Sequence, residues 1–322
     1  MTLDTDSSLT APPRGRVRGA WCPLLCWSVT ALLLVVAFHL LGNTVSNVAS
    51  RSVFRWMVAR WNDTVSYGVD YSVGWFIPVI SLGVLFRRRE DIVRERGGVN
   101  FWGLPIILVA LLMHWAAARA QQPRVSLMSL IAILWALPLV FGGWKVARHF
   151  IFPVGYLMFC IPWNFLDALT FPMRLFSSAL SAGLLNGIGI GVVRSGTIIH
   201  SLSSEGLDFN VADPCSGLSS MLALLALTAV YANLTERTWL RQAVLFITAI
   251  PLAIAGNIFR IGTIAVVAEF FSREVALTLY HDYSAFLIFP VAILLMIGAG
   301  NLISRFSFKG IKEWISTRLQ HT

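Results

Sequence analysis

The sequence predicts an all-α integral membrane protein with about eight transmembrane helices. Hydrophobic residues make up 57% of its 322 residues and charged residues only 13%, whereas a soluble domain carries about 25% charged residues. The mean hydropathy is +0.72. A chain with so few charges cannot cover its surface in water, which excludes a soluble enzyme, a disordered regulator and a nucleic-acid-binding domain.

Eight apolar stretches account for the predicted crossings, because a helix needs about 20 apolar residues to span the hydrocarbon. We expect these crossings near residues 21–43, 72–86, 101–118, 126–143, 150–170, 217–234, 242–266 and 284–303. The second stretch is short, and we expect its helix to start earlier, within 65–71. The stretch 171–193 is apolar but rich in Gly and Ser and carries Arg174. It predicts a helix in the outer interface or a re-entrant segment.

The basic residues orient this arrangement, since inner loops of membrane proteins are enriched in Lys and Arg. With the N-terminus in the cytoplasm, 16 of the 25 Lys and Arg residues fall in inner segments. They are Arg14, Arg16, Arg18, Arg87, Arg88, Arg89, Arg94, Arg96, Lys145, Arg148, Arg237, Arg241, Arg305, Lys309, Lys312 and Arg318. Both ends of the chain are therefore expected in the cytoplasm, and the net charge of +9 reflects topology rather than polyanion binding. We expect a multi-pass protein of the cell inner membrane.

The chain divides into three predicted parts. A cytoplasmic segment at 1–20 precedes one membrane catalytic domain at 21–305, and a cytoplasmic amphipathic tail follows at 306–322. Apolar residues recur in this tail at helical spacing, which is typical of an interfacial helix. These residues are Phe308, Ile311, Ile315 and Leu319.

A small outer hairpin is predicted just before residue 212. The runs Val193–His200 and Leu207–Val211 are short, β-branched or alternating, and they are separated by Ser-Glu-Gly. This pattern favours two strands with a turn near 203–206. The hairpin leads directly into Asp213-Pro214-Cys215.

Cys215 is the first of three polar residues that the membrane setting singles out. Pro214 suits the first turn of a helix, so Cys215 is expected at or near a helix N-terminus, where the dipole lowers the pKa of a thiol. A cysteine in this position fits the role of a nucleophile. The local sequence fits an inert small residue at a helix start equally well. Cys22, Cys26 and Cys160 fall inside apolar runs, where a thiol behaves as a small hydrophobe.

Arg260 and Asn257 share a helix face within the seventh apolar stretch, because they are three residues apart. Arg260 follows Arg241 by 19 residues, which corresponds to roughly 28 Å of helix and places it near the outer boundary of the hydrocarbon. A snorkelling arginine is the simpler reading. Asn257, on a face expected to pack inward, argues against it.

His281 lies just before the eighth crossing, 23 residues ahead of Ser304, which also puts it at the outer surface. Histidine is the side chain best suited to move protons near neutral pH, although an ordinary exposed loop histidine is an equally simple reading. Three separate segments thus bring a nucleophile, a cation and a proton carrier to one membrane face, as an acyl-transfer site requires.

Five further residues are candidates for substrate binding. Ser216 and Asp282 adjoin Cys215 and His281, while Tyr71 and Ser72 begin the second crossing on the outer side, together with Asn257 on the arginine face. No Gly-rich phosphate loop or zinc-ligand spacing occurs, so neither a cofactor nor a metal is expected.

In these motifs the sequence resembles the exosortase/archaeosortase family. Pro-Cys-Ser-Gly-Leu at 214–218, Asn-Ile-Phe-Arg-Ile at 257–261, and His281 ahead of Phe286-Leu287-Ile288-Phe289 are similar to the family's cysteine, arginine and histidine motifs, in the family's order. Tyr-Ser-Val-Gly at 71–74 with the arginines at 87–89 resembles its early helix and basic loop, and Phe-Cys-Ile-Pro-Trp at 159–163 its middle stretch.

The resemblance implies a membrane cysteine transpeptidase that acts at the outer face. Its partners would be secreted proteins with a C-terminal tripartite sorting signal: a short motif, a transmembrane helix and a basic cluster. The enzyme would cut near the motif and transfer the new C-terminus to an unknown lipid or glycan acceptor. In bacteria the family often accompanies exopolysaccharide production.

Two other readings stay open on the sequence alone. One is a membrane cysteine protease that uses water as the acceptor of the same acyl-enzyme. The other is a non-enzymatic transporter or component of exopolysaccharide export. Transporters usually carry inverted repeats and helices broken at mid-membrane, which this sequence does not clearly show.

Overall fold

The computed structural model describes residues 21–42, 51–63, 71–95, 97–163, 165–203, 208–210, 218–236, 238–271, 273–278 and 284–305. The elements that bear on the argument are α1 (Trp21–Val35), a π-helical turn η1 (Val36–Leu40), α2 (Val53–Asn62), the 3₁₀ turn η2 (Ser72–Trp75), α3 (Phe76–Arg87), α4 (Arg89–Arg94), α5 (Gly103–Arg119), α6 (Pro123–Tyr156), the 3₁₀ turn η3 (Leu157–Cys160), α7 (Phe165–Gly187), β1 (Val192–Ser195), β2 (Ile198–Ser201), β3 (Phe209–Asn210), α8 (Leu218–Thr235), α9 (Trp239–Phe270), α10 (Arg273–Thr278) and α11 (Ser284–Arg305). The chain is therefore helical apart from one small sheet, as the sequence predicts.

Most of the predicted apolar stretches form helices, and two of the described helical segments are long and apolar enough to cross a membrane, although the first of them folds into two arms at Gly143. They are Pro123–Cys160 and Trp239–Phe270. Five shorter apolar helical segments accompany them, at Ser28–Leu40, Ser72–Arg87, Gly103–Arg119, Leu222–Thr235 and Ile293–Ile303. The total of eight crossings stays a prediction, and the expected tail at 306–322 lies outside the described residues.

α6 folds back on itself at Gly143. The loop expected between the crossings at 126–143 and 150–170 is therefore much shorter than predicted. Gly143 has φ 70° and ψ −176°, a backbone conformation open to glycine and costly for other residues. Nε1 of Trp135, in the first arm, donates a hydrogen bond of 3.2 Å to the carbonyl of Ala147 in the second. The backbone N–H groups of Gly97 and Asn100 donate to carbonyls of Gly142 and Val140, which the turn leaves without helical partners.

The predicted crossing at 150–170 is wrong in its bounds. The second arm of α6 starts right after Gly143 and ends at Tyr156, and η3 carries the chain only to Cys160. Pro162 follows, and because a proline disfavours helical backbone in the residue before it, the helix stops there. Residues from 165 onward belong to α7.

The predicted hairpin has three strands rather than two. The stretch expected as one strand, 193–200, turns back at Gly196, whose φ is 62°, so β1 and β2 pair antiparallel with Ser195 opposite Ile198. A two-residue turn of this kind needs a residue with positive φ, which glycine supplies. β3 adds to the other side of β2, with Ile199 opposite Phe209. The turn predicted near 203–206 falls mostly outside the described residues.

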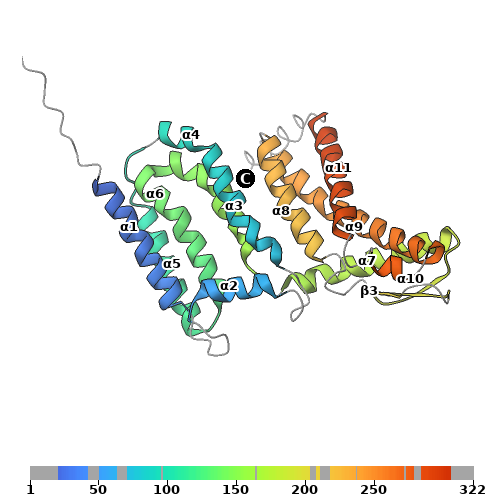
Figure 1. Ribbon diagram of the computed structural model, residues 1–322. Helices are drawn as coiled ribbons and strands as arrows, with labels where there is room; N and C mark the ends of the chain where they lie inside the picture. Colours follow the sequence, from blue (N-terminus) through green and yellow to red (C-terminus); the bar gives the residue numbers. More distant parts are fainter. Residues whose placement is uncertain are drawn as a thin grey trace, which may run out of the picture.

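Two helices lie across the ends of the others (Figure 1). α7 covers most of the stretch 171–193, and its orientation fits the interfacial helix predicted there. α2 was not predicted, because its two arginines interrupt the apolar pattern. Its start is fixed by Ser52, whose side chain accepts a hydrogen bond from the backbone N–H of Arg55.

The described helices form two groups, α1 to α6 and α7 to α11 (Figure 1). An apolar cluster joins the groups by packing Leu222 and Ala226 of α8 against residues of the first group. These are Trp61, Tyr71, Ile77, Tyr156 and Cys160. Arg88 adds a polar link, since its Nη2 donates to Oδ1 of Asn233 on α8 at 2.8 Å.

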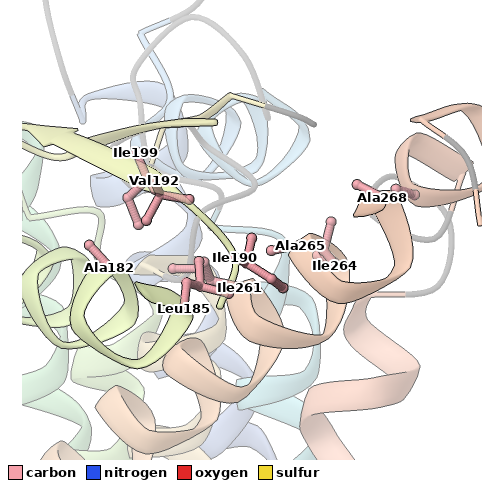
Figure 2. Close-up of a cluster of buried hydrophobic side chains, with 10 residues drawn as sticks. Ala182, Leu185, Ile190, Val192, Ile199, Ile261, Ile264, Ala265 and Ala268 are labelled. Carbon is pink, nitrogen blue, oxygen red and sulfur yellow. The ribbon is translucent and has the colours of Figure 1, made fainter. Parts of the chain in front are cut away.

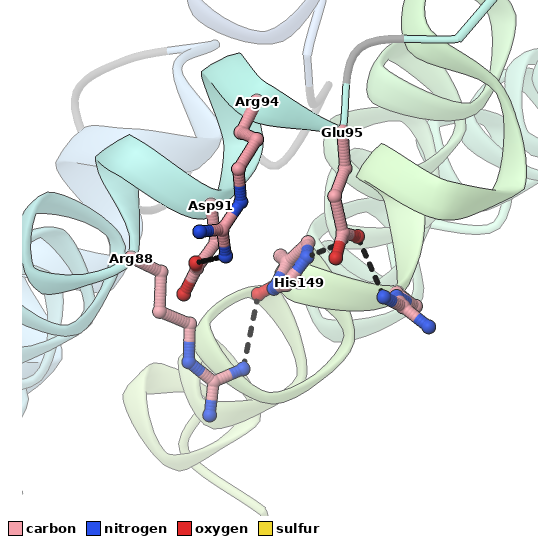
Figure 3. A network of polar contacts seen from close by, with 6 residues as sticks. Arg88, Asp91, Arg94, Glu95 and His149 are labelled. Atoms are coloured by element: carbon pink, nitrogen blue, oxygen red, sulfur yellow. Dashed lines mark hydrogen bonds and ion pairs between the residues drawn. The ribbon is translucent and has the colours of Figure 1, made fainter.

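The end of the molecule that carries Arg88 is also tied together by Glu95 (Figure 3). Its carboxylate accepts hydrogen bonds from Nε2 of His149 at 3.0 Å and from Nη2 of Arg148 at 2.6 Å. Both hydrogen bonds hold the pKa of Glu95 below its usual value, and the bond from His149 has the larger effect. Two arginines of the predicted inner loops, Arg88 and Arg148, therefore also fasten helices to one another.

We expect Arg88→Met to destabilise the protein by about 1.5–3 kcal/mol, the range for hydrogen bonds to charged groups. Methionine keeps the aliphatic stem but loses the bonds to Asn233 and to the carbonyl of His149. Thermal unfolding in detergent measures the effect. Arg89→Met is the matched control, because Arg89 is more than half exposed and pairs only loosely with Glu90. Equal melting temperatures for the two variants would show that Arg88 does not join the groups.

Candidate active site

Six polar side chains on the neighbouring helices α7 and α9 form a set that we call the polar seam. It consists of Arg174, Ser177, Ser178 and Ser181 on α7 and of Asn257 and Arg260 on α9, and one hydrogen bond, between Asn257 and Ser177, joins the two helices. The α7 members follow the spacing i, i+3, i+4, i+7 and share one helix face. All four are buried, from 0% exposed at Ser178 to 9% at Arg174. Polar groups enclosed in an apolar, membrane-type chain are costly and mark a functional region.

The α9 side of the seam contains the predicted arginine motif. Nδ2 of Asn257 donates a hydrogen bond of 3.0 Å to Oγ of Ser177, which holds this face of α9 against α7. Arg260, one turn further on, is 2% exposed. A snorkelling arginine would extend its head group away from the protein, so the enclosed position of Arg260 argues against that reading.

The six residues of the polar seam include two guanidinium groups and no carboxylate. A guanidinium group stabilises a thiolate or a developing oxyanion that lies beside it.

α8 and α11 run parallel and begin at the same end of the molecule. Oγ1 of Thr228 donates to Sδ of Met296 at 3.3 Å, and Ala232, one turn later on α8, packs with Ile303 on α11. Both helices thus advance together, so their first residues, Leu218 and Ser284, lie at corresponding levels.

α9 runs opposite to both helices and brings Arg260 to that same end. Leu245 packs with Ala232 and Ile303. Arg260 lies 15 residues beyond Leu245 on α9, and Leu218 lies 14 residues before Ala232 on α8. Each interval corresponds to about 21–23 Å of helix, and both lead toward the end of the molecule at which α7 lies alongside α9 (Figure 2).

The early motif at 71–74, together with Trp61 before it, packs against the middle motif at 159–163 beside α8. The hydroxyl of Tyr71 donates to the carbonyl of Trp163 at 2.9 Å, and Nε1 of Trp61 donates to the carbonyl of Cys160 at 2.9 Å. Tyr71 is 6% exposed, so this candidate substrate-binding residue serves the packing of the two motifs. Ser72, the other candidate here, begins η2, which contacts α8.

Four of the predicted site residues lie outside the described residues: Cys215, Ser216, His281 and Asp282. The structure describes the chain from Leu218 onward, three residues after Cys215, and from Ser284 onward, three residues after His281. Of the three predicted catalytic residues, the structure describes Arg260. It also describes the starts of α8 and α11, which follow Cys215 and His281 along the chain.

Residues 61–298 match the transmembrane exosortase family. The chain belongs to this family. No curated protein and no solved structure matches it. Exosortases are membrane proteins that act in general as cysteine transpeptidases on secreted proteins, and the apolar helices described above agree with a membrane location.

In this exosortase the polar residues of α7 were missed by sequence reasoning. Only Arg174 drew notice, as a reason to doubt that 171–193 crosses the membrane. The signal was the recurrence of Arg and Ser at 174, 177, 178 and 181, which forms a polar stripe on an otherwise apolar helix. Among the described residues, no three His, Cys, Asp or Glu side chains gather as metal ligands would.

Proposed function

We propose that this exosortase is a cysteine transpeptidase that cleaves the C-terminal sorting signal of secreted proteins at the outer membrane face. The observation that carries the proposal is the enclosed Arg260, at the end where α8 and α11 begin. Three residues of chain span at most about 11 Å. Cys215 and His281 each precede one of these helix starts by three residues, which supports the proposal that they share a site with Arg260.

The proposed first half-reaction forms an acyl-enzyme. The Cys215 thiolate adds to the scissile carbonyl, and the resulting oxyanion is stabilised by the guanidinium of Arg260. The C–N bond then breaks, with His281 donating a proton to the leaving amine. The products are a thioester on Cys215 and the released C-terminal tail of the signal.

The second half-reaction transfers the substrate to an acceptor. His281, now deprotonated, takes a proton from the acceptor nucleophile as it attacks the thioester. The C–S bond breaks and the thiolate returns to its position near Arg260. Arg260 favours the thiolate throughout, because a nearby cation lowers the pKa of a thiol. Asn257 and Ser177 keep the arginine-bearing face of α9 in place.

The orientation of the chain forms part of the proposal. Both ends lie in the cytoplasm of a cell with this protein in its inner membrane, and the end that carries Arg260 faces outward. Arg88 and Glu95 then lie at the inner side, as the excess of basic residues there requires.

Mass analysis of a processed substrate tests the reaction type. The probe is a secreted protein of the same cell whose C-terminus carries a short motif, an apolar helix and a basic cluster. We expect its new C-terminus to carry an added group when it is produced with this exosortase. A free carboxylate in every processed molecule would identify a hydrolase, and an intact tail would contradict both enzymatic readings.

A further inference from the structure

Five arginines lie at the end of the molecule where α2 runs across the other helices (Figure 1). They belong to residues 51–63, which contain α2, and to residues 119–124, which join α5 to α6: Arg51, Arg55, Arg60, Arg119 and Arg124. These two described segments contain one carboxylate, Asp63. Topology does not explain the excess of positive charge, because this end is predicted to face outward and basic residues are enriched on the inner side.

The ring of Trp56 holds two of these arginines. The guanidinium carbon of Arg60 lies 5.8 Å from the ring centroid and that of Arg124 lies 5.3 Å from it, both within the range of cation–π contacts, which is about 6 Å. Arg60 follows Trp56 by four residues and shares its face of α2, whereas Arg124 comes from the first turn of α6. Trp56 packs against an apolar cluster that includes Leu127 and Ile161. The fold therefore holds both charges at one ring.

Arg124 occupies an unfavourable electrostatic position. Its Nε donates a hydrogen bond of 2.6 Å to the carbonyl of Pro162, which fixes its head group, and the like charge of Arg60 acts on it. It also lies in the first turn of α6, where the positive end of the helix dipole disfavours a cation. A bound anion offsets both effects, because the two guanidinium groups and the helix end all attract it.

The place of these residues in the fold favours the phosphate of a lipid headgroup as the anion. α2 lies across the ends of apolar helices of a membrane protein (Figure 1), so this end of the molecule is at the level of the headgroups. Tryptophan and arginine are typical of this level, where the ring lies at the boundary and the guanidinium reaches the phosphates. Arg60 and Arg124 are both partly exposed, and a guanidinium matches the geometry of a phosphate. Two cations at one ring favour a headgroup with net negative charge.

We infer that Arg60 and Arg124, held at the ring of Trp56, bind the phosphodiester headgroup of an anionic phospholipid in the outer leaflet. The inference goes beyond the proposed function and does not depend on it, because no step of the acyl transfer uses these residues. The other three arginines of this end are exposed and attract a headgroup only as screened charges. A free phosphate ion shares the chemistry of the headgroup, and the experiment separates the two.

Native mass spectrometry of the full chain in a neutral detergent tests the site. The probe is phosphatidylglycerol, titrated at about 0.15 M salt, where exposed charges are largely screened. We expect the Kd of the tightest-bound lipid to rise about 10-fold in Arg60→Gln, because a charge-assisted hydrogen bond to phosphate is lost. Arg55→Gln is the matched control on the same helix, since Arg55 is exposed, and its Kd should change less than about twofold. Equal changes in the two variants would overturn the inference.

Thermal unfolding separates a loss of lipid binding from a loss of folding. A lipid that binds only the folded protein raises its melting temperature. We expect saturating phosphatidylglycerol to raise the melting temperature of the wild type and of Arg55→Gln, and to raise that of Arg60→Gln less. Arg60→Lys keeps the charge but loses the planar fork, so it should recover part of the affinity. A lipid-induced rise of the same size in all four proteins would contradict a site at Arg60.

Two further ligands identify the occupant. Inorganic phosphate at millimolar concentration should leave the phosphatidylglycerol adduct in place, because the acyl chains of the lipid add apolar contacts that the ion lacks. Displacement of the lipid by phosphate would assign the site to the free ion and overturn the lipid assignment. Phosphatidylcholine carries the same phosphodiester without a net charge, so it should bind more weakly than phosphatidylglycerol. Equal affinities for the two lipids would overturn the preference for an anionic headgroup.

Discussion

Cys215→Ala is expected to abolish processing of tailed substrates, with a loss of at least about 10³-fold, because removal of a nucleophile eliminates the covalent pathway. The amount of protein in the membrane should stay equal to that of the wild type, since alanine is small and helix-compatible. Processing is measured by the mass of the secreted substrate. Normal cleavage by this variant would remove Cys215 from the mechanism.

Cys160→Ala is the matched control for the loss of a thiol. Cys160 is 4% exposed in the apolar cluster that joins the two helix groups, so its removal affects packing and not the reaction. An impermeant thiol reagent applied from outside should label the wild type and Cys160→Ala, but not Cys215→Ala. Labelling that persists in Cys215→Ala would mean that another cysteine is the exposed thiol.

Arg260→Gln is expected to lower kcat by about 10²–10³-fold, the usual effect of removing one group that stabilises an oxyanion. KM should change little, because the guanidinium acts mainly on charge that develops in the transition state. Arg260→Lys keeps the charge but loses the planar fork, so we expect it to recover part of the activity. Single-turnover kinetics with folded protein of equal concentration measure both variants.

Arg241→Gln is the control on the same helix. Arg241 lies near the other end of α9, 3.8 Å from Glu236, whose side chain is only 8% exposed, so the melting temperature of this variant is measured alongside its kcat. Its kcat should stay within about threefold of the wild type. Equal losses in Arg241→Gln and Arg260→Gln would indicate a general effect of charge on α9 and contradict a specific role for Arg260.

The helical segments were predictable because hydropathy and helix signals are local properties of the chain. The predicted stretches 101–118 and 217–234 agree with α5 and α8 within two residues. Two of the errors lie at glycines. Gly143 and Gly196 both adopt positive φ, which nothing in the composition around them required, and each folds the chain back where a continuous element was expected.

The candidate site was predictable only in part. The spacing of Asn257 and Arg260 indicated a shared face, but their partner surface on α7 depends on a contact between residues 80 positions apart. Serines are common in apolar helices, so Ser177, Ser178 and Ser181 did not indicate a functional site by themselves. Their importance follows from their burial in the folded protein, which a single sequence does not reveal.

The sequence by itself determined that this protein is an apolar helical bundle, which segments are helical, and which polar residues do not belong in a membrane. Only the tertiary structure decided where α6 turns back, how α8 and α11 align, and that a serine of α7 meets Asn257 of α9. The physical reason is range: hydropathy and backbone preference act over a few residues. The enclosure of a charge, by contrast, is decided by packing between helices that are distant along the chain.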